Sequence, residues 1–183
     1  MERTYSLGRT TFVLPKPLRD KFNQLKNTAG FQSSTLFLGY LLDLYTTLRG
    51  FGGFRSLDGV GQLVKRSTAN PSFFEHDSRA RVIVGKLLLA RTSEKEEAKN
   101  YRAARIEVNK EVCVRFSRLA RTAQLPGQKG FKKNADFLAY LLDAFSPLSE
   151  LARGRPPSCV QEDLQYLAFH ISQAEKGAGS NFS

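Results

Sequence analysis

One apolar segment occurs twice in this chain of 183 residues, and the repeat constrains the fold more than any other feature. "FLGYLLDLY" occupies residues 37–45 and "FLAYLLDAF" occupies residues 137–145, with six of the nine positions identical. The match continues upstream, where "GFQSSTLFL" (30–38) faces "GFKKNADFL" (130–138) at the same offset of one hundred residues. A duplication of this kind marks a supersecondary unit that is used twice.

Further upstream the register of the repeat slips by six, because the second copy carries extra residues at 124–129. With that gap allowed, "KFNQLKNTA" (21–29) faces "RFSRLARTA" (115–123), and "FVLPKPL" (12–18) faces "IEVNKEV" (106–112). Each copy is therefore a unit of about forty residues, too small to bury its own apolar face.

Each unit predicts a strand followed by a helix. Residues 12–14 and 106–108 are short segments whose outer residues are apolar with period two, which favours a brief strand. The apolar residues that follow recur at helical spacing: Leu18, Phe22, Leu25 and Ala29 in the first copy, and Val112, Phe116, Leu119 and Ala123 in the second.

The repeated segment itself predicts a second helix in each copy. Ser34 and Asn134 are suitable N-caps for these helices. From Leu36 to Leu48 the first of them is apolar nearly all the way round, and such a helix is buried on several sides. Since one unit is too small to provide this cover, we expect each copy to pack against the other.

The order strand, helix, turn, helix, made in two copies, resembles the ribbon-helix-helix family of DNA-binding proteins. The residues that carry the resemblance are "TFVLPKPLRDKFNQLKNTAGFQSSTLFLGYLLDLY" and "RIEVNKEVCVRFSRLARTA…GFKKNADFLAYLLDAF". The resemblance implies a mainly α fold in which tandem ribbon-helix-helix units form an intramolecular pseudo-dimer with a two-stranded antiparallel ribbon, plus additional helices. The expected parts are units 9–48 and 103–148, a glycine-rich connection (49–102) with short strand or helix elements, and a C-terminal helix (158–176).

In that family the outward side chains of the ribbon enter the major groove of DNA, which admits a two-stranded ribbon. Phe12, Leu14, Ile106 and Val108 should point inward, so alternation leaves an outward set of Arg9, Thr11 and Val13, and Ala103, Arg105 and Glu107. Arg9, Thr11 and Arg105 suit base or phosphate contact, and Glu107 can accept a hydrogen bond from cytosine. Val13, Ala103 and Glu107 favour a rival interpretation, a protein-interaction module that keeps the fold without reading bases.

The family also binds phosphate with backbone N–H groups at the start of the second helix, where the helix dipole is positive. The matching positions are Ser33 and Ser34 in the first copy and Lys133 and Asn134 in the second, with Lys129 and Lys132 adding charge beside the second. Plain helix capping explains Ser34 and Asn134 equally well.

Arg115, Arg118 and Arg121 fall three residues apart on the first helix of the second copy. They form either a phosphate-facing stripe or an ordinary solvated face. The matching helix of the first copy also holds Asp20, so DNA contact should depend more on the second copy.

Charge and composition agree with a nucleic-acid partner. Lys and Arg number 28 against 17 Asp and Glu, a net charge of +11 that attracts polyanions: nucleic acid first, an anionic membrane surface or an acidic protein second. No apolar run is long enough for a membrane span, and the amino terminus lacks the apolar core of a secretory signal. Two Cys and two His make neither a disulfide framework nor a convincing metal site. We therefore expect an intracellular, DNA-associated protein of the nucleoid or nucleus, with no cofactor and no membrane partner.

The connection between the copies is glycine-rich over residues 49–74. Its first residues, Arg49, Phe51, Phe54 and Arg55, suit single-stranded DNA or RNA, although a flexible connection with anchoring aromatics explains them better. Residues 81–91 are an apolar run that fits a strand or a buried helix.

Two further helices are expected. Residues 93–105 predict a charged helix capped by Ser93. Residues 158–176 predict a terminal helix capped by Ser158, with one apolar face: Val160, Leu164, Leu167 and Ile171. That helix should pack on the pseudo-dimer or bind a partner protein.

A catalytic site is not expected. Glu75, His76, Asp77 and Ser78 are consecutive, so their side chains point in different directions, whereas catalytic groups converge from separate segments. The sequence thus predicts a non-enzymatic protein that binds double-stranded DNA, as a transcriptional regulator or a DNA-packaging factor. A monomer in solution is permitted, because the expected dimer is closed within one chain, and higher assembly through residues 158–176 is equally open.

Overall fold

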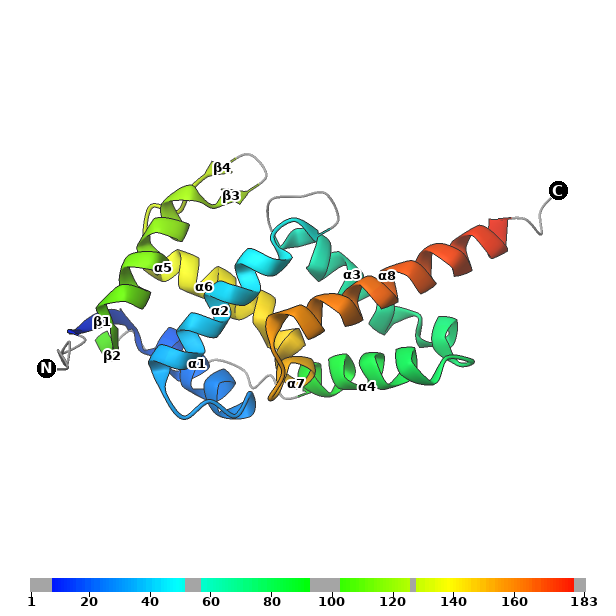
Figure 1. Ribbon diagram of the computed structural model, residues 1–183, viewed down its shortest axis with the longest axis horizontal. Helices are drawn as coiled ribbons and strands as arrows, with labels where there is room; N and C mark the ends of the chain where they lie inside the picture. The colour runs from blue at the N-terminus through cyan, green and yellow to red at the C-terminus, as the bar shows by residue number, and fades with distance from the viewer. Residues whose placement is uncertain (1–7, 52–56, 93–102, 126–127, 180–183) are drawn as a thin grey trace, which may run out of the picture.

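A computed structural model of the protein describes residues 8–51, 57–92, 103–125 and 128–179. The fold is mainly helical, and a two-stranded antiparallel sheet lies at one end of it (Figure 1). The sheet is made of β1 (Arg9–Pro15) and β2 (Ala103–Asn109), which we call the ribbon. The predicted strands are confirmed, and both are longer than expected. The mainly α class is also confirmed.

The ribbon is centred on one cross-strand pair. Phe12 lies opposite Ile106, flanked by Thr11 opposite Glu107 and Val13 opposite Arg105. Burial alternates along both strands, as the pleat of a strand requires: Leu14, Ala104, Ile106 and Val108 are buried, and Phe12 is partly buried. The predicted inward side chains are therefore confirmed.

Each strand leads directly into a helix of thirteen residues, α1 (Lys16–Thr28) after β1 and α5 (Lys110–Thr122) after β2. The second helix of each unit is α2 (Ser34–Leu48) or α6 (Asn134–Phe145). Their N-caps are Ser33 and Lys133, so the prediction of Ser34 and Asn134 as caps is wrong by one residue. The Ser33 hydroxyl accepts a hydrogen bond from the Leu36 N–H at 3.1 Å, which satisfies one free donor of the first turn.

The described residues of the insertion, 124–125 and 128–129, form the two arms of a small hairpin. Two-residue strands, β3 (Gln124–Leu125) and β4 (Gln128–Lys129), pair antiparallel and project from the end of α5 (Figure 1). The chain leaves the hairpin at Gly130, whose φ of 73° matches the φ of 83° at Gly30 in the first unit. The insertion is thus accommodated without changing the backbone that leads into the second helix.

The two copies of the repeated segment bury each other through aromatic contacts that occur in matched pairs. Phe37 contacts Phe145 with ring centroids 5.4 Å apart, and Tyr45 contacts Phe137 at 5.5 Å. Both pairs join residues at equivalent positions of the repeat. These rings are at most 2% exposed, so the contacts lie in the core.

Ion pairs between the units are also matched. The Lys21 Nζ lies 2.9 Å from the Asp143 Oδ1, and the Arg115 Nη1 lies 2.6 Å from the Asp43 Oδ1. Lys21 corresponds to Arg115 in the repeat, and Asp43 corresponds to Asp143. Each ion pair joins the first helix of one unit to the second helix of the other.

The connection between the units is helical where it is described. It contains α3 (Asp58–Ala69), the 3-10 helix η2 (Pro71–Phe74) and α4 (Ser78–Thr92). Val60, Leu63 and Val64 of α3 are buried, so the expectation of a flexible connection is wrong for α3. The run 81–91 is part of a helix. Of the predicted helix 93–105, residues 93–102 lie outside the described residues, and the remainder is strand.

The carboxyl-terminal part adds η3 (Ser146–Leu148), the short α7 (Ser149–Ala152) and the long α8 (Pro157–Gly179). All four residues of the predicted apolar face are buried: Val160, Leu164, Leu167 and Ile171. The helix begins at Pro157, so Ser158 lies inside its first turn and the prediction of Ser158 as the cap is wrong.

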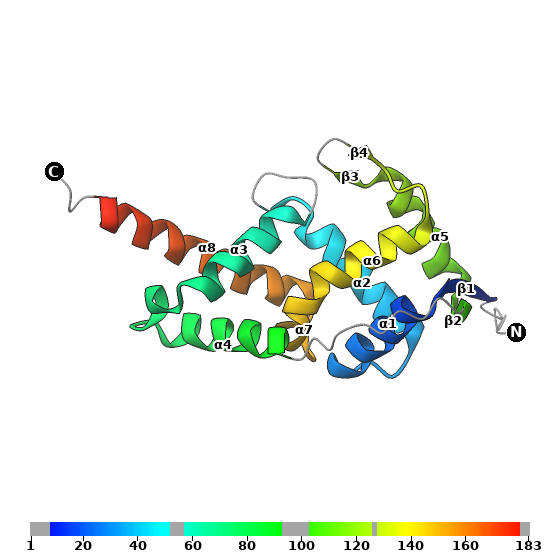
Figure 2. The ribbon, with the colours of Figure 1, turned by 180° about the vertical axis from the view of Figure 1, so that it is seen from behind.

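The ribbon and the end of α8 lie at opposite ends of the molecule (Figures 1 and 2). α3 and α4 lie alongside α8, away from the ribbon. Within the described part of the chain, none of the helices combines the length and apolar character needed to cross a bilayer.

Candidate nucleic-acid interface

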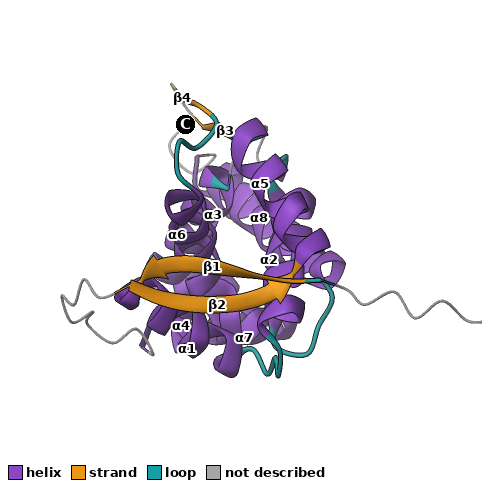
Figure 3. Ribbon diagram, turned by 90° about the vertical axis from the view of Figure 1, so that its left-hand side faces the viewer, coloured by secondary structure: helices purple, strands orange, loops and turns teal. Residues whose placement is uncertain are grey.

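The outer face of the ribbon is open to solvent in front of the helices (Figure 3). Its described outward residues are all exposed: Arg9, Thr11 and Val13 on β1, and Arg105 and Glu107 on β2. These are the predicted outward positions, apart from Ala103, whose side chain lies outside the described residues. A ribbon of two strands fits the major groove of B-form DNA, where base edges are distinguishable.

The two halves of this face differ in charge. Near one end, the Arg9 Nη1 lies 3.8 Å from the Glu107 Oε2, and both side chains are mostly exposed. In the other half, Arg105 stands opposite Val13 and forms no ion pair among the described residues. The Val13 side chain is 64% exposed. One half therefore carries an ion pair, and the other carries a guanidinium that no described carboxylate engages, beside an exposed methyl surface.

A pocket of about 360 Å³ opens between the Arg9 end of the ribbon and the start of α2. It is lined by Arg9, Ser33, Ser34, Thr35, Leu36, Glu107, Val108 and Asn109. The Asn109 N–H donates to the Thr35 Oγ1 at 3.1 Å and so joins the helix start to the ribbon. First-turn N–H groups and the Arg9 guanidinium favour an anion here, while the Glu107 carboxylate opposes one.

The start of α6 is built differently. Its N-cap, Lys133, makes no side-chain capping bond, and Lys132, Lys133 and Asn134 are exposed. The hydrogen bond from Asn109 to Thr35 has no counterpart at this helix start. The equivalent residues are Pro15, which lacks an N–H, and Ala135, which lacks a hydroxyl. Viewed with the ribbon in front, α2 and α6 lie behind opposite halves of it (Figure 3). The Lys129 backbone is in β4, and its side chain lies outside the described residues.

The predicted arginine stripe on α5 divides into different roles. Arg115 is engaged by Asp43, and the Arg121 Nε donates to the Ser117 carbonyl at 3.2 Å. Arg118 is exposed and forms no ion pair among the described residues. Of the three, Arg118 is best placed for an external anion, while Arg115 joins the two units.

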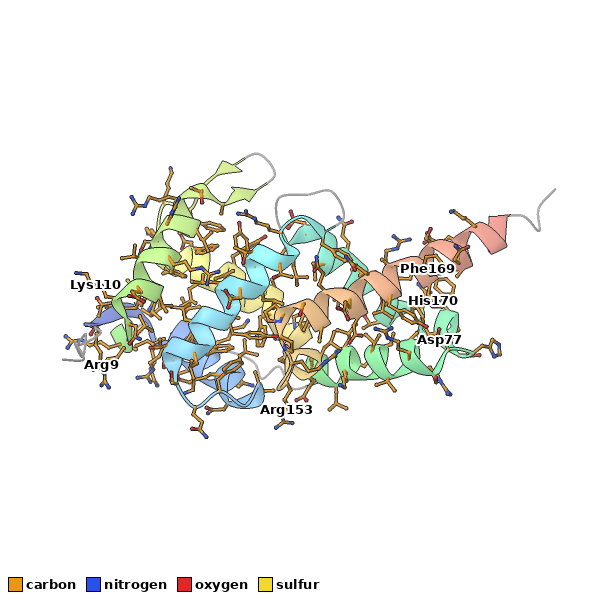
Figure 4. All side chains as sticks on the ribbon, viewed as in Figure 1. Arg9, Asp77, Lys110, Arg153, Phe169 and His170 are labelled. Atoms are coloured by element: carbon orange, nitrogen blue, oxygen red, sulfur yellow. The ribbon has the colours of Figure 1, made fainter. Side chains whose placement is uncertain are left out.

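Two basic residues beside the ribbon were missed by sequence reasoning. Lys16 and Lys110 are the first residues of α1 and α5, immediately after the strands. Lys110 and Arg9 extend from the same end of the molecule (Figure 4). The signal was available in the repeat, because Lys16 and Lys110 occupy equivalent positions in the two units.

Asp77, in the run of residues 75–78 that was not expected to be catalytic, joins the start of α4 to α8 (Figure 4). Its Oδ1 accepts from the Ala80 N–H at 2.9 Å, and its Oδ2 accepts from the Tyr166 hydroxyl at 2.6 Å. His170 Nε2 lies 3.1 Å from the same Oδ2. The Ala80 and Tyr166 hydrogen bonds lower the pKa of Asp77, and the bond to Asp77 raises the pKa of Tyr166.

The rest of that run does not converge on Asp77. Glu75, His76 and Ser78 are exposed. The absence of catalysis stays a prediction, as does the absence of a cofactor; no group of three or more metal-ligating side chains occurs among the residues described.

Of the aromatic and basic residues after the first unit that suit single-stranded nucleic acid, the structure describes only Arg49 and Phe51. Arg49 is exposed, but Phe51 is partly buried against the core. Phe54 and Arg55 lie outside the described residues.

Comparison with known proteins found no relative: no family model matches the chain, and neither a curated protein nor a solved structure matches it significantly.

Proposed function

We propose that this chain is a tandem ribbon-helix-helix protein that binds double-stranded DNA by placing the ribbon in the major groove. The observation that carries the proposal is an exposed antiparallel ribbon whose two strands come from equivalent positions of two repeated units. The matched aromatic and ionic contacts between the units support an intramolecular pseudo-dimer, with the Phe12–Ile106 pair near its approximate two-fold axis.

Phosphate contacts would come from the groups beside the ribbon. Lys132, Lys133 and Arg118 are exposed, and Lys16 and Lys110 begin the helices that follow the strands. Backbone donors at helix starts and flexible cations position a protein on duplex DNA, while groove contacts specify sequence. The net charge of +11 supports the same partner. Transcriptional regulation or DNA packaging is the setting we propose for this binding.

The direct test compares two double variants that lose the same charge. Arg9→Ala with Arg105→Ala removes both arginines of the ribbon face, and Lys65→Ala with Arg81→Ala removes two exposed cations from α3 and α4, away from the ribbon. Fluorescence anisotropy with a labelled duplex measures affinity across a salt series. We expect the ribbon variant to bind at least about tenfold more weakly, because each good contact to a base is worth ~1–3 kcal/mol.

The control variant should retain nearly the affinity of the unmodified protein. Equal losses in the two variants would indicate binding by overall charge, and an unchanged ribbon variant would contradict groove binding. Competition with single-stranded DNA and RNA of the same length tests the alternative partner suggested by residues 49–55.

A protein-assembly role is the second candidate function. The Arg9–Glu107 ion pair and the exposed Val13 are less suited to DNA than a uniformly polar face. Val82, Leu89 and Phe169 are also large apolar side chains exposed on α4 and α8. If this candidate is correct, no duplex is retained even at low salt.

A further inference from the structure

We infer that the DNA site of this protein is not palindromic and is bound in one orientation, with the ribbon half that holds Val13 and Arg105 making the dominant base contacts. This inference rests on the proposed function and names the class of duplex that the ribbon selects.

Symmetry connects the protein to its site. A two-fold symmetric reader presents the same residues to both half-sites and therefore selects a palindrome. In this chain the Phe12–Ile106 pair is central, so residues at equal distances from it occupy equivalent places. Thr11 is thereby matched with Arg105, and Val13 is matched with Glu107. At the first pair of equivalent positions one strand carries a hydroxyl and the other a guanidinium. At the second pair one strand carries methyl groups and the other a carboxylate. The two half-sites therefore meet different chemical groups.

The Val13–Arg105 half suits guanine and thymine. The Arg105 guanidinium has no ion-pair partner among the described residues, and an arginine can donate two hydrogen bonds to the O6 and N7 of guanine. Val13 stands directly opposite Arg105 on the neighbouring strand and is 64% exposed. Its methyl groups suit the C5-methyl of thymine. We therefore expect guanine and thymine close together in this half-site.

The Arg9–Glu107 half suits a different base pair. Glu107 can accept a hydrogen bond from the N4 amino group of cytosine but is repelled by phosphate. Arg9 lies within ion-pair distance of Glu107, at 3.8 Å, so its charge is partly compensated before DNA arrives. This half should contribute less affinity than the other and should prefer cytosine.

The starts of α2 and α6 also differ, and this difference favours the same orientation on DNA. α2 begins with uncharged Ser33 and Ser34, and the Ser33 hydroxyl already accepts from a first-turn N–H. α6 begins beside exposed Lys132 and Lys133 with no side-chain capping bond. Since the two helices lie behind opposite halves of the ribbon (Figure 3), phosphate attraction also differs between the half-sites.

A symmetrised ribbon provides the matched control. The triple variant R9A/T11R/V13E places on β1 the residues found at the equivalent positions of β2. All three side chains are exposed, so the fold should be retained, and circular dichroism checks this. Bound duplexes are selected from a random pool at near-physiological salt with the unmodified protein and with this variant.

We expect the unmodified protein to enrich a non-palindromic motif and the symmetrised protein to enrich a palindrome. Arg105→Ala should reduce discrimination at the guanine position roughly 5- to 150-fold, the range for a good bidentate base contact, and leave the preference in the other half unchanged. Arg9→Ala should change only the other half.

A palindrome selected by the unmodified protein would overturn the inference and leave the proposed function standing. Recovery of duplexes without any motif would do the same. No recovery at any salt concentration would remove the inference and the proposed function together.

Discussion

The two repeated units are alike where they are buried and different where they meet solvent beside the ribbon. Phe37 and Phe137 are both completely buried, and Leu41 and Leu141 are each only 2% exposed. At the helix starts, by contrast, Ser33 corresponds to the exposed Lys133. Buried rings of one unit contact those of the other, as in the Phe37–Phe145 and Tyr45–Phe137 pairs, so a change at one of these positions alters the packing of its partner, whereas the exposed positions carry no such constraint. The units therefore differ most at the positions that the proposed DNA contact would use.

The largest expected effect breaks the shared core. Leu41→Asp or Leu141→Asp places a carboxylate at a dry site, which costs several kcal/mol out of a typical total stability of ~5–15 kcal/mol. Both variants should be unfolded by far-UV circular dichroism. Leu36→Asp is the matched control, because Leu36 is 63% exposed in the first turn of α2, where an acidic residue is favourable. A native spectrum for either core variant would contradict the mutual burial of the units.

The glycines that precede the second helices should respond unequally. Gly30→Ala costs about 1 kcal/mol from its positive φ alone, because a Cβ there meets no atom within 4 Å. At Gly130 the same Cβ would lie 2.6 Å from the Arg121 carbonyl oxygen, so Gly130→Ala should cost about 3 kcal/mol. Urea denaturation of the two variants measures the difference in free energy of unfolding. Equal losses would mean that the hairpin relaxes to admit the methyl group.

The next largest effect is a difference in stability between phenylalanine substitutions at the equivalent tyrosines Tyr40 and Tyr140. The Tyr140 hydroxyl accepts from the Leu57 N–H at 2.7 Å, so Tyr140→Phe leaves a buried donor without its acceptor and should cost about 1–2 kcal/mol. Among the described residues the buried Tyr40 hydroxyl has no hydrogen-bond partner, and burial raises the pKa of Tyr40 to about 12. Tyr40→Phe should therefore leave the thermal midpoint unchanged or raise it. A larger loss of stability for Tyr40→Phe than for Tyr140→Phe would contradict the conclusion that only the Tyr140 hydroxyl makes a stabilising hydrogen bond.

The smallest effect concerns the ion pairs between the units. Asp43→Asn and Asp143→Asn each remove one exposed pair, and such pairs contribute ~0.2–1 kcal/mol. A double-mutant cycle with Lys21→Met and Asp143→Asn measures the coupling free energy, and the cycle for Arg115 and Asp43 provides the comparison. Coupling that persists in high salt would show that the pairs are less solvated than their exposure indicates.

The repeat predicted most of the core, because its apolar spacing is dictated by burial. The inward residues of the strands and the apolar face of α8 followed from periodicity alone. The N-cap error at Ser34 arose because Ser33 and Ser34 both suit the position, and only backbone geometry distinguishes them. Sequence spacing also could not show that Asp43 reaches Arg115, since that contact joins helices far apart in the chain.

The helix α3, in the stretch expected to be a flexible connection, was not predicted, and the reason is local. Gly59 and Gly61 weaken the helix signal of α3, yet Val60, Leu63 and Val64 are buried in a helix that packs against α8 and α4. Tertiary packing here outweighs an unfavourable propensity. For the candidate interface, alternation predicted the exposed residues of the ribbon. The Arg9–Glu107 ion pair depends on cross-strand register, which a single sequence does not show.

The joining of β1 and β2 in one polypeptide also affects how the protein behaves on dilution. Two separate subunits that share a ribbon must associate before the ribbon exists, so their folded fraction depends on concentration. In this chain both strands arrive together, and the ribbon persists however few molecules are present. Its melting temperature should therefore be the same at nanomolar and micromolar protein.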